Sequence, residues 1–207
     1  MFTFEFMLIW LGWLMAGGSP GAATMSIAGT AMQRGRGAPL MVSLGILAGS
    51  ASWGIAAALG LSAIMLANAW VFEVIRYFGT GYLLWLAIKA LRSAVKLSGV
   101  VSGTPFSGGA KTLFAKGMAL HITSPKAILS WGSIYAIVAP SNASIVDFFG
   151  YFGVLYAGSI LIFIGYALLF STPKIVQGYS RARRWFDFAF AGFFGFASVK
   201  ILTARLS

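Results

Sequence analysis

The chain contains no cysteine, one histidine and only four acidic residues among its 207 positions. The absence of cysteine excludes disulfides, thiol redox chemistry and thiolate metal sites. One histidine and a few carboxylates supply neither a metal-ligand set nor the nucleophile and base of a typical catalytic site. We therefore expect no metal, no cofactor and no enzymatic activity.

Charged residues are scarce as a class, at 9% of the chain, whereas 59% of the residues are hydrophobic. This composition lies far outside the range of soluble domains and predicts an all-α integral membrane protein embedded in a lipid bilayer. A bilayer core about 30 Å thick needs roughly 20 apolar residues per spanning helix. Six runs are long enough, at residues 4–32, 39–66, 71–91, 111–139, 147–171 and 185–203.

The formal net charge of +11 would suggest a nucleic-acid partner in a soluble protein. Here the basic residues gather in three connections between the apolar runs, and such connections are typically cytoplasmic. We therefore expect no nucleic acid, cytoplasmic basic loops and both termini outside. The basic residues of these connections are Arg34, Arg36, Arg92, Lys96, Lys111, Lys174, Arg181, Arg183 and Arg184.

Two of the apolar runs contain a helix-breaking sequence near their middle. Ser19-Pro20-Gly21 interrupts the first run, and Ser124-Pro125 interrupts the fourth. Proline removes an amide donor and its ring clashes with the carbonyl group four residues earlier. A serine followed by proline is also typical of the N-cap and first position of a new helix. The sequence therefore predicts that transmembrane helices 1 and 4 are each broken into two half-helices, at Pro20 and Pro125.

The two breaks belong to a wider internal similarity. On either side of a Ser- and Gly-rich linker at residues 93–110, we predict two three-helix repeats, residues 1–92 and 111–207. An odd number of spans per repeat inverts the second relative to the first, an architecture typical of transporters. The matched features are Ser19-Pro20 with Ser124-Pro125, Gly45 to Ser50 with Gly153 to Ser159, and Gly81 and Lys89 with Gly192 and Lys200.

The breaks supply the candidate binding site. A half-helix begins with unpaired amide donors and the positive end of its dipole, which together favour an anion such as a carboxylate. The alternative is a packing kink whose freed carbonyl groups are satisfied by neighbouring helices or water. The predicted substrate-binding residues are Ser19, Pro20, Gly21 and Ala22 at the first break and Ser124, Pro125 and Lys126 at the second.

Two ionisable residues lie beside the second break only. Lys126 is a candidate to bind a substrate carboxylate or to couple protons, and the alternatives are a bond to a backbone carbonyl or snorkelling to an interface. His121 is a candidate proton carrier because its pKa is ordinarily near neutral, and the alternative is a hydrogen-bonded core histidine. Trp131 and Tyr135 are either core residues or part of a cavity wall. Close helix packing is predicted at Gly45, Gly49, Gly153 and Gly158.

These motifs resemble those of the LysE/RhtB family of amino-acid exporters, over nearly the whole sequence. The segment from Ser19 to Thr24 resembles the first-helix Pro-Gly-Pro-Asn motif, and Ser124-Pro125-Lys126-Ala127 resembles the Asn-Pro-Lys-Ala motif. Gly45 to Gly49 and Gly81 to Leu91 resemble the second-helix glycine motif and the third helix. The resemblance implies a bacterial inner-membrane exporter with six helices in two inverted repeats, driven by proton antiport. A homodimer is a candidate assembly.

The chain departs from this family pattern at several positions. Ala22 and Ala23 replace the second proline and the asparagine of the first motif, and Ser124 replaces the asparagine of the second. Ser50 stands where the family often has aspartate. We therefore expect no carboxylate deep in the membrane, which leaves His121, Lys126 or a facilitated mechanism. A lysine or arginine substrate would lack a counter-ion.

The sequence thus predicts an alternating-access exporter of a small amino acid or related organic anion, bound between the two breaks. The alternative is a membrane-embedded interaction or scaffold protein that has lost transport activity. A channel is disfavoured because the helices offer few polar residues beyond the breaks. The substrate, the driving ion and the oligomeric state are left open by the sequence.

Overall fold

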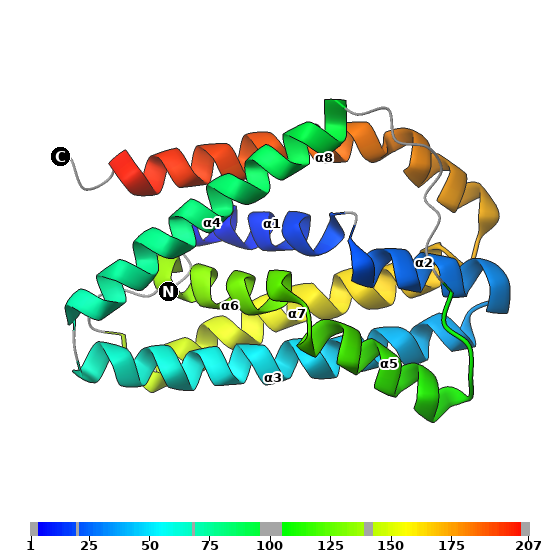
Figure 1. Cartoon of the computed structure of the whole chain (residues 1–207), viewed down its shortest axis with the longest axis horizontal. Helices are drawn as coiled ribbons and strands as arrows, with labels where there is room; N and C mark the ends of the chain where they lie inside the picture. The colour runs from blue at the N-terminus through cyan, green and yellow to red at the C-terminus, as the bar shows by residue number, and fades with distance from the viewer. Residues whose placement is uncertain (1–3, 20, 68, 96–104, 139–142, 204–207) are drawn as a thin grey trace.

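The computed structural model describes the chain except for residues 1–3, 20, 68, 96–104, 139–142 and 204–207 (Figure 1). The described residues form eight α-helices and no strand. The all-helical fold class is therefore confirmed. In chain order the helices are α1 (Phe4–Gly18), α2 (Ala22–Arg34), α3 (Gly37–Ala67), α4 (Ala69–Val95), α5 (Ala110–Ile122), α6 (Pro125–Val138), α7 (Ile145–Leu169) and α8 (Pro173–Thr203).

The first and fourth apolar runs are each divided into two helices, as the sequence predicts. α1 and α2 are separated at residues 19–21, and α5 and α6 at Thr123 and Ser124. Pro125 is the first residue of α6, where its missing amide hydrogen leaves no helical bond unmade. Pro20 lies outside the described residues.

Two helices of the described chain are long and apolar enough to cross a membrane by themselves. They are Gly37–Gly60 within α3 and Ile145–Leu169, which is α7. A shorter apolar helical segment runs over Ile9–Gly18. The half-helices are individually too short, so each broken pair would need to span together. The count of six spans therefore stays a prediction.

α8 is longer than the last predicted span. It begins at Pro173, so the basic segment that includes Lys174 and Arg184 is helical and is not a loop. Proline at the first helical position favours this early start. The expectation of a basic loop before residue 185 is therefore wrong.

The linker between the two halves is also shorter than the sequence suggests. α4 continues through Ser93 to Val95, and α5 already begins at Ala110. The last turn of α4 is held by tertiary contacts, because Ala94 is buried and the Ser93 hydroxyl donates a hydrogen bond to the Asp187 carboxylate at 2.7 Å. Sequence composition alone does not reveal such a contact.

The half-helices α1 and α6 lie in the middle of the molecule (Figure 1). α4 and α8 pack against each other on one side, where α4 contacts α6 and α8 contacts α1. α3, α5 and α7 lie on the other side, where α7 contacts α1 and α3 contacts both α5 and α6. Groups at the two helix breaks are therefore enclosed by unbroken helices from both halves of the chain.

Glycines permit the close contact between α3 and α5. A Cβ atom at Gly45 would collide with the carbonyl oxygen of Phe114, and one at Gly49 would lie 3.1 Å from that of Met118. A Cβ atom at Gly158 would lie 3.0 Å from a methyl group of Leu14 on α1. Gly153 differs, because it is exposed and a Cβ atom there would meet no described atom within 4 Å. Close packing therefore explains the predicted packing glycines Gly45, Gly49 and Gly158 but not Gly153.

Candidate functional site

The first break is capped by Thr24 rather than by Ser19. The N-cap of α2 is Gly21, whose amide donates to the Thr24 hydroxyl at 2.9 Å. Ser19 instead donates its hydroxyl proton backward to the Ala16 carbonyl at 2.9 Å. Short polar side chains compete in this way for nearby backbone groups. The predicted N-cap role of Ser19 is therefore wrong, although the residue lies at the break.

Carbonyl groups freed at the first break are satisfied by the second half of the chain. The Gly18 carbonyl accepts hydrogen bonds from the hydroxyl groups of Tyr166, at 2.7 Å, and Tyr179, at 3.3 Å. The Ala16 carbonyl accepts one from the Lys126 ammonium group at 2.8 Å. Satisfaction by neighbouring helices, which the sequence analysis held as an alternative, is thus present in the structure.

The second break satisfies its carbonyl groups more locally. The amides of Thr123 and Ser124 donate to the carbonyls of Ala119 and His121, at 2.9 and 3.2 Å. The Ile122 carbonyl accepts a hydrogen bond from the indole N–H of Trp53 on α3 at 3.1 Å. The His121 carbonyl, which the proline was expected to deprive of its helical partner, is therefore engaged by the turn itself.

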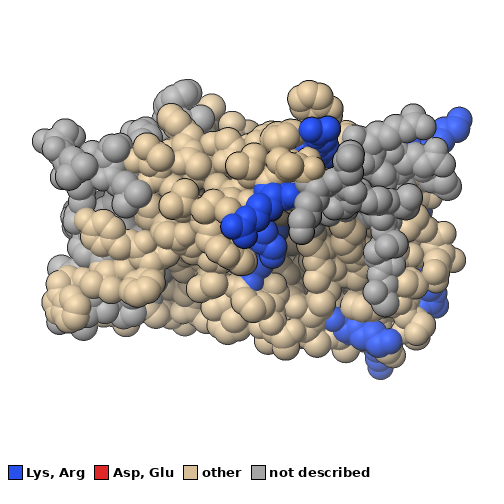
Figure 2. All heavy atoms as spheres, turned by 45° about the horizontal axis from the view of Figure 1, so that its top comes forward, with Lys and Arg blue, Asp and Glu red and all other residues tan. Residues whose placement is uncertain are grey.

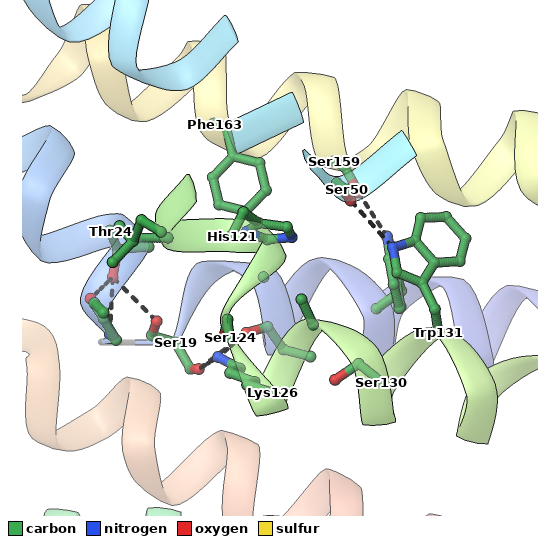
Figure 3. Close-up of a pocket in the computed structure, with 18 residues that line it drawn as sticks. Ser19, Thr24, Ser50, His121, Ser124, Lys126, Ser130, Trp131, Ser159 and Phe163 are labelled. Atoms are coloured by element: carbon green, nitrogen blue, oxygen red, sulfur yellow. Dashed lines mark hydrogen bonds between the residues drawn. The ribbon is translucent and has the colours of Figure 1, made fainter. Parts of the chain in front are cut away.

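Lys126 joins the two breaks directly (Figure 3). From the first turn of α6 its ammonium group donates to the Ala16 carbonyl and to the Ser19 hydroxyl. The backbone-carbonyl alternative for this lysine is therefore present. An ammonium group has three N–H donors, so these two acceptors leave one donor for a further partner.

A cavity of about 80 Å³ lies between the two breaks (Figure 3). This volume is several times the roughly 10–15 Å³ that one water molecule requires. Pro125 is exposed and does not line the cavity, and Pro20 is not described. Predicted binding residues that do line it are Ser19, Gly21, Ala22, Ser124 and Lys126, together with His121.

The charge of the cavity favours an anionic group. Among the described residues that line it, Lys126 is the one with a full positive charge and none is acidic. His121 adds a titratable ring, which contacts the Phe163 ring edge-on at a centroid distance of 5.8 Å. An amino acid carboxylate suits this lining better than a second cation does.

Comparison with known proteins agrees with the motifs. The LysE type translocator family matches residues 14–205, which is nearly the whole chain. The chain belongs to the LysE family. The resemblance inferred from the broken-helix motifs is therefore confirmed, and the membrane setting expected from the composition agrees with it.

Two curated relatives of this LysE-family chain are threonine efflux proteins. Those of Escherichia coli strain K12 and Salmonella typhi are 34% and 33% identical over 181 residues, which cover 86% of this chain and 88% of each relative. The leucine efflux protein of Enterobacter sp. strain 638 is 29% identical over 119 residues, or 56% of this chain and 54% of that relative. These relatives are named as efflux proteins and not as enzymes. No solved structure matches the chain significantly.

One wall of the cavity in this LysE-family protein contains Trp131, for which the sequence left a cavity-wall position open, together with Trp13, Ser50 and Ser159, which were not predicted to line it. Trp13 and Trp131 donate their indole protons to Ser159 and Ser50, at 3.0 and 3.1 Å. All four residues line the cavity. A signal was available, because the two serines are matched positions of the internal repeat. Tyr135 is fully buried in the core, where it donates to the Gly54 carbonyl, and does not line the cavity.

One carboxylate of the described chain is buried outside the cavity lining. Asp187 is only 4% exposed and accepts a hydrogen bond from the Ser93 hydroxyl. The predicted last span begins at residue 185, whereas α8 begins at Pro173, so Asp187 lies well inside the helix. Asp187 is not among the residues that line the cavity, and no described residue of the lining carries a carboxylate.

Proposed function

We propose that this LysE-family protein is a secondary transporter that exports a small uncharged amino acid, or a related organic anion, across the inner membrane. The observation that carries the proposal is the bridge from Lys126 to the first break across a cavity shared by both breaks. The named activities of the threonine and leucine efflux relatives agree with an amino acid substrate.

In this proposal the substrate carboxylate binds the free ammonium donor of Lys126, the first amides of α2 and the backbone amide of Lys126 in the first turn of α6. Ser19, Gly21 and Ala22 come from one break, and Ser124 and Lys126 from the other. Positive helix ends and an ammonium group reinforce one another where water is excluded. The substrate ammonium group then faces serine hydroxyls and aromatic rings, since no described acidic residue lines the cavity.

Alternating access would follow from two inverted three-helix repeats. The helix packing supports this, because equivalent helices of the two repeats make equivalent contacts: α3 contacts the half-helices α5 and α6, and α7 contacts the half-helices α1 and α2. The remaining unbroken helices pair across the same axis, α3 with α7 and α4 with α8. Inverted repeats with broken helices at a central site are typical of transporters that rock around a fixed binding site.

The distribution of basic residues supports the proposed orientation. On the face shown in Figure 2, the lysine and arginine side chains lie from the centre to the right-hand end, and the described surface at the left-hand end carries none. In Figure 1 this right-hand end holds the α2–α3 connection and the start of α5. The positive-inside rule assigns that end to the cytoplasm, with both termini outside.

Export against a gradient needs a coupled ion, and we assign proton coupling to groups at the second break. His121 and Lys126 both line the cavity and can exchange protons with a bound substrate or water. The first break, by contrast, has no ionisable residue among those that line the cavity.

Reconstitution of the purified protein into liposomes tests the proposal. Uptake of radiolabelled threonine, leucine, lysine and glutamate is measured with and without an inward or outward pH gradient. We expect transport of at least one uncharged amino acid, stimulated by the gradient, and none of lysine. If no amino acid moves across a broad panel, the substrate class is wrong; if lysine moves as fast as threonine, the charge argument is wrong.

A further inference from the structure

We propose that Trp13 and Trp131, which are hydrogen-bonded to Ser159 and Ser50, form a gate that closes the cavity toward the outer side of the membrane. This inference rests on the proposed transport function. It goes beyond it by naming the residues that must separate when substrate leaves.

Hydrogen bonds and a ring contact within the gate connect the two halves of the chain. Trp13 on α1 bonds Ser159 on α7, whereas Trp131 on α6 bonds Ser50 on α3. The two indole rings also contact each other, with centroids 4.5 Å apart and planes inclined by 57°. Each hydrogen bond therefore joins one proposed repeat to the other, and so does the ring contact.

Burial shows which end of the cavity is shut. The four gate residues are nearly inaccessible: Trp131 is 1%, Ser50 2%, Ser159 3% and Trp13 8% exposed. At the break end, by contrast, Ala22 is exposed, and Ser19, Ser124 and Lys126 are half-buried. The tryptophan end of the cavity is therefore buried, whereas the residues at its break end are partly exposed.

Tightly packed aromatic residues lie beyond the tryptophans. Tyr135 and Phe148 are fully buried, and both belong to the hydrophobic cluster that contains Trp13 and Trp131. The Tyr135 ring contacts the rings of Trp131 and Phe148. In Figure 1 α6 runs from its break toward the end of the molecule that holds the N-terminus, which the proposed orientation places outside. An outward path must therefore separate Trp13 from Trp131 before it reaches this packed region.

The opposite side of the cavity has no indole pair at the positions that the internal repeat matches to Trp13 and Trp131, and the ring contact described there is the edge-on one between His121 and Phe163. The offset that aligns Ser19 with Ser124 also aligns Trp13 with Met118 and Trp131 with Ser26. Ser26 bonds within its own helix, to the Ala22 and Ala23 carbonyls. Small and flexible side chains thus occupy the positions that the internal repeat aligns with the two indoles of the outer side.

Thiol labelling tests the gate without any transport measurement. Because the chain has no cysteine, the single variant Ser130→Cys reports on the cavity lining alone. A membrane-impermeant maleimide is applied to oriented vesicles from either side. We expect labelling from the inner side and little from the outer side when both tryptophans are present.

Gate variants are then added to the Ser130→Cys background. Trp131→Ala should raise the outer labelling rate by at least about tenfold, because it removes a large buried side chain. Ser50→Ala and Ser159→Ala keep both rings and should raise it by about fivefold, as expected for one lost hydrogen bond; they keep the test valid if the tryptophan variant misfolds. Trp70→Ala, which removes a tryptophan that is 65% exposed, should change nothing.

Equal labelling from both sides in the parent, or outer rates unchanged by Trp131→Ala and both serine variants, would overturn the gate. The liposome assay separates the two proposals. Amino acid transport together with labelling that the gate variants do not change would overturn the gate proposal and leave the proposed transport function standing. The expected labelling pattern with no amino acid transport would remove the transport function instead and, with it, the physiological role of the gate.

Discussion

The two helix breaks look alike in sequence but differ in how they are stabilised. The first break receives donors from the second half of the chain, namely Lys126, Tyr166 and Tyr179. The second break is closed mainly by its own turn, with the indole of Trp53 as the added donor. Two prolines at matched positions of the sequence thus produce two different breaks. The first accepts hydrogen bonds from residues distant in sequence, and the second supplies the charged side chain.

This difference assigns unequal roles to the two breaks. The first, with Gly21 as N-cap and Thr24 as capping side chain, offers backbone amides and no charge. The second adds Lys126 and His121 to its half-helix. In the proposed function both breaks bind the carboxylate, but only the second can exchange protons.

The largest expected effect comes from removing the bridge between the breaks. Lys126→Met should lower amino acid transport by roughly ten- to a hundredfold, since losing a charged hydrogen-bond partner costs about 1.5–3 kcal/mol. Initial uptake rates in liposomes measure this. The matched control is Lys116→Met, which removes an exposed lysine bonded to the Ser107 carbonyl. Similar rates in the two variants would mean that the bridge has no role in transport.

An intermediate effect is expected from the ionisable ring that only the second break carries. His121→Gln should abolish the stimulation of uptake by a pH gradient while leaving exchange of labelled for unlabelled substrate at equal pH within about twofold, since only the coupled step needs the proton carrier. Both fluxes are measured on the same liposomes. Retained gradient stimulation would shift proton coupling to Lys126.

The smallest effect should distinguish the caps of the two breaks. Thr24→Val removes the side chain that accepts the Gly21 amide proton and should destabilise the protein by about 1 kcal/mol, measured as a lower midpoint of thermal unfolding in detergent. Ser124→Ala at the second break should change the midpoint by less than half as much. A larger loss at Ser124 would mean that the second break, and not the first, depends more on its capping side chain.

The sequence alone determined the features that depend on local chemistry. The places of the two breaks follow from proline, whose missing amide and ring act on its own helix, and α1, α2, α5 and α6 end and begin there. The apolar composition set the helical class, and the motifs around Ser19 and Ser124 identified the family. The extent of α8 was misjudged because its basic first turns look like a loop when only hydropathy is considered.

Only the tertiary structure decided which groups meet. Lys126 contacts Ala16, Trp131 bonds Ser50 and Asp187 accepts from Ser93, although these partners lie far apart along the chain. Such contacts depend on how whole helices pack, and no local pattern specifies them. Prolines and glycines therefore fixed where the helices break, whereas long-range packing decided that the two breaks share one cavity, with a lysine between them and two tryptophans closing its far end.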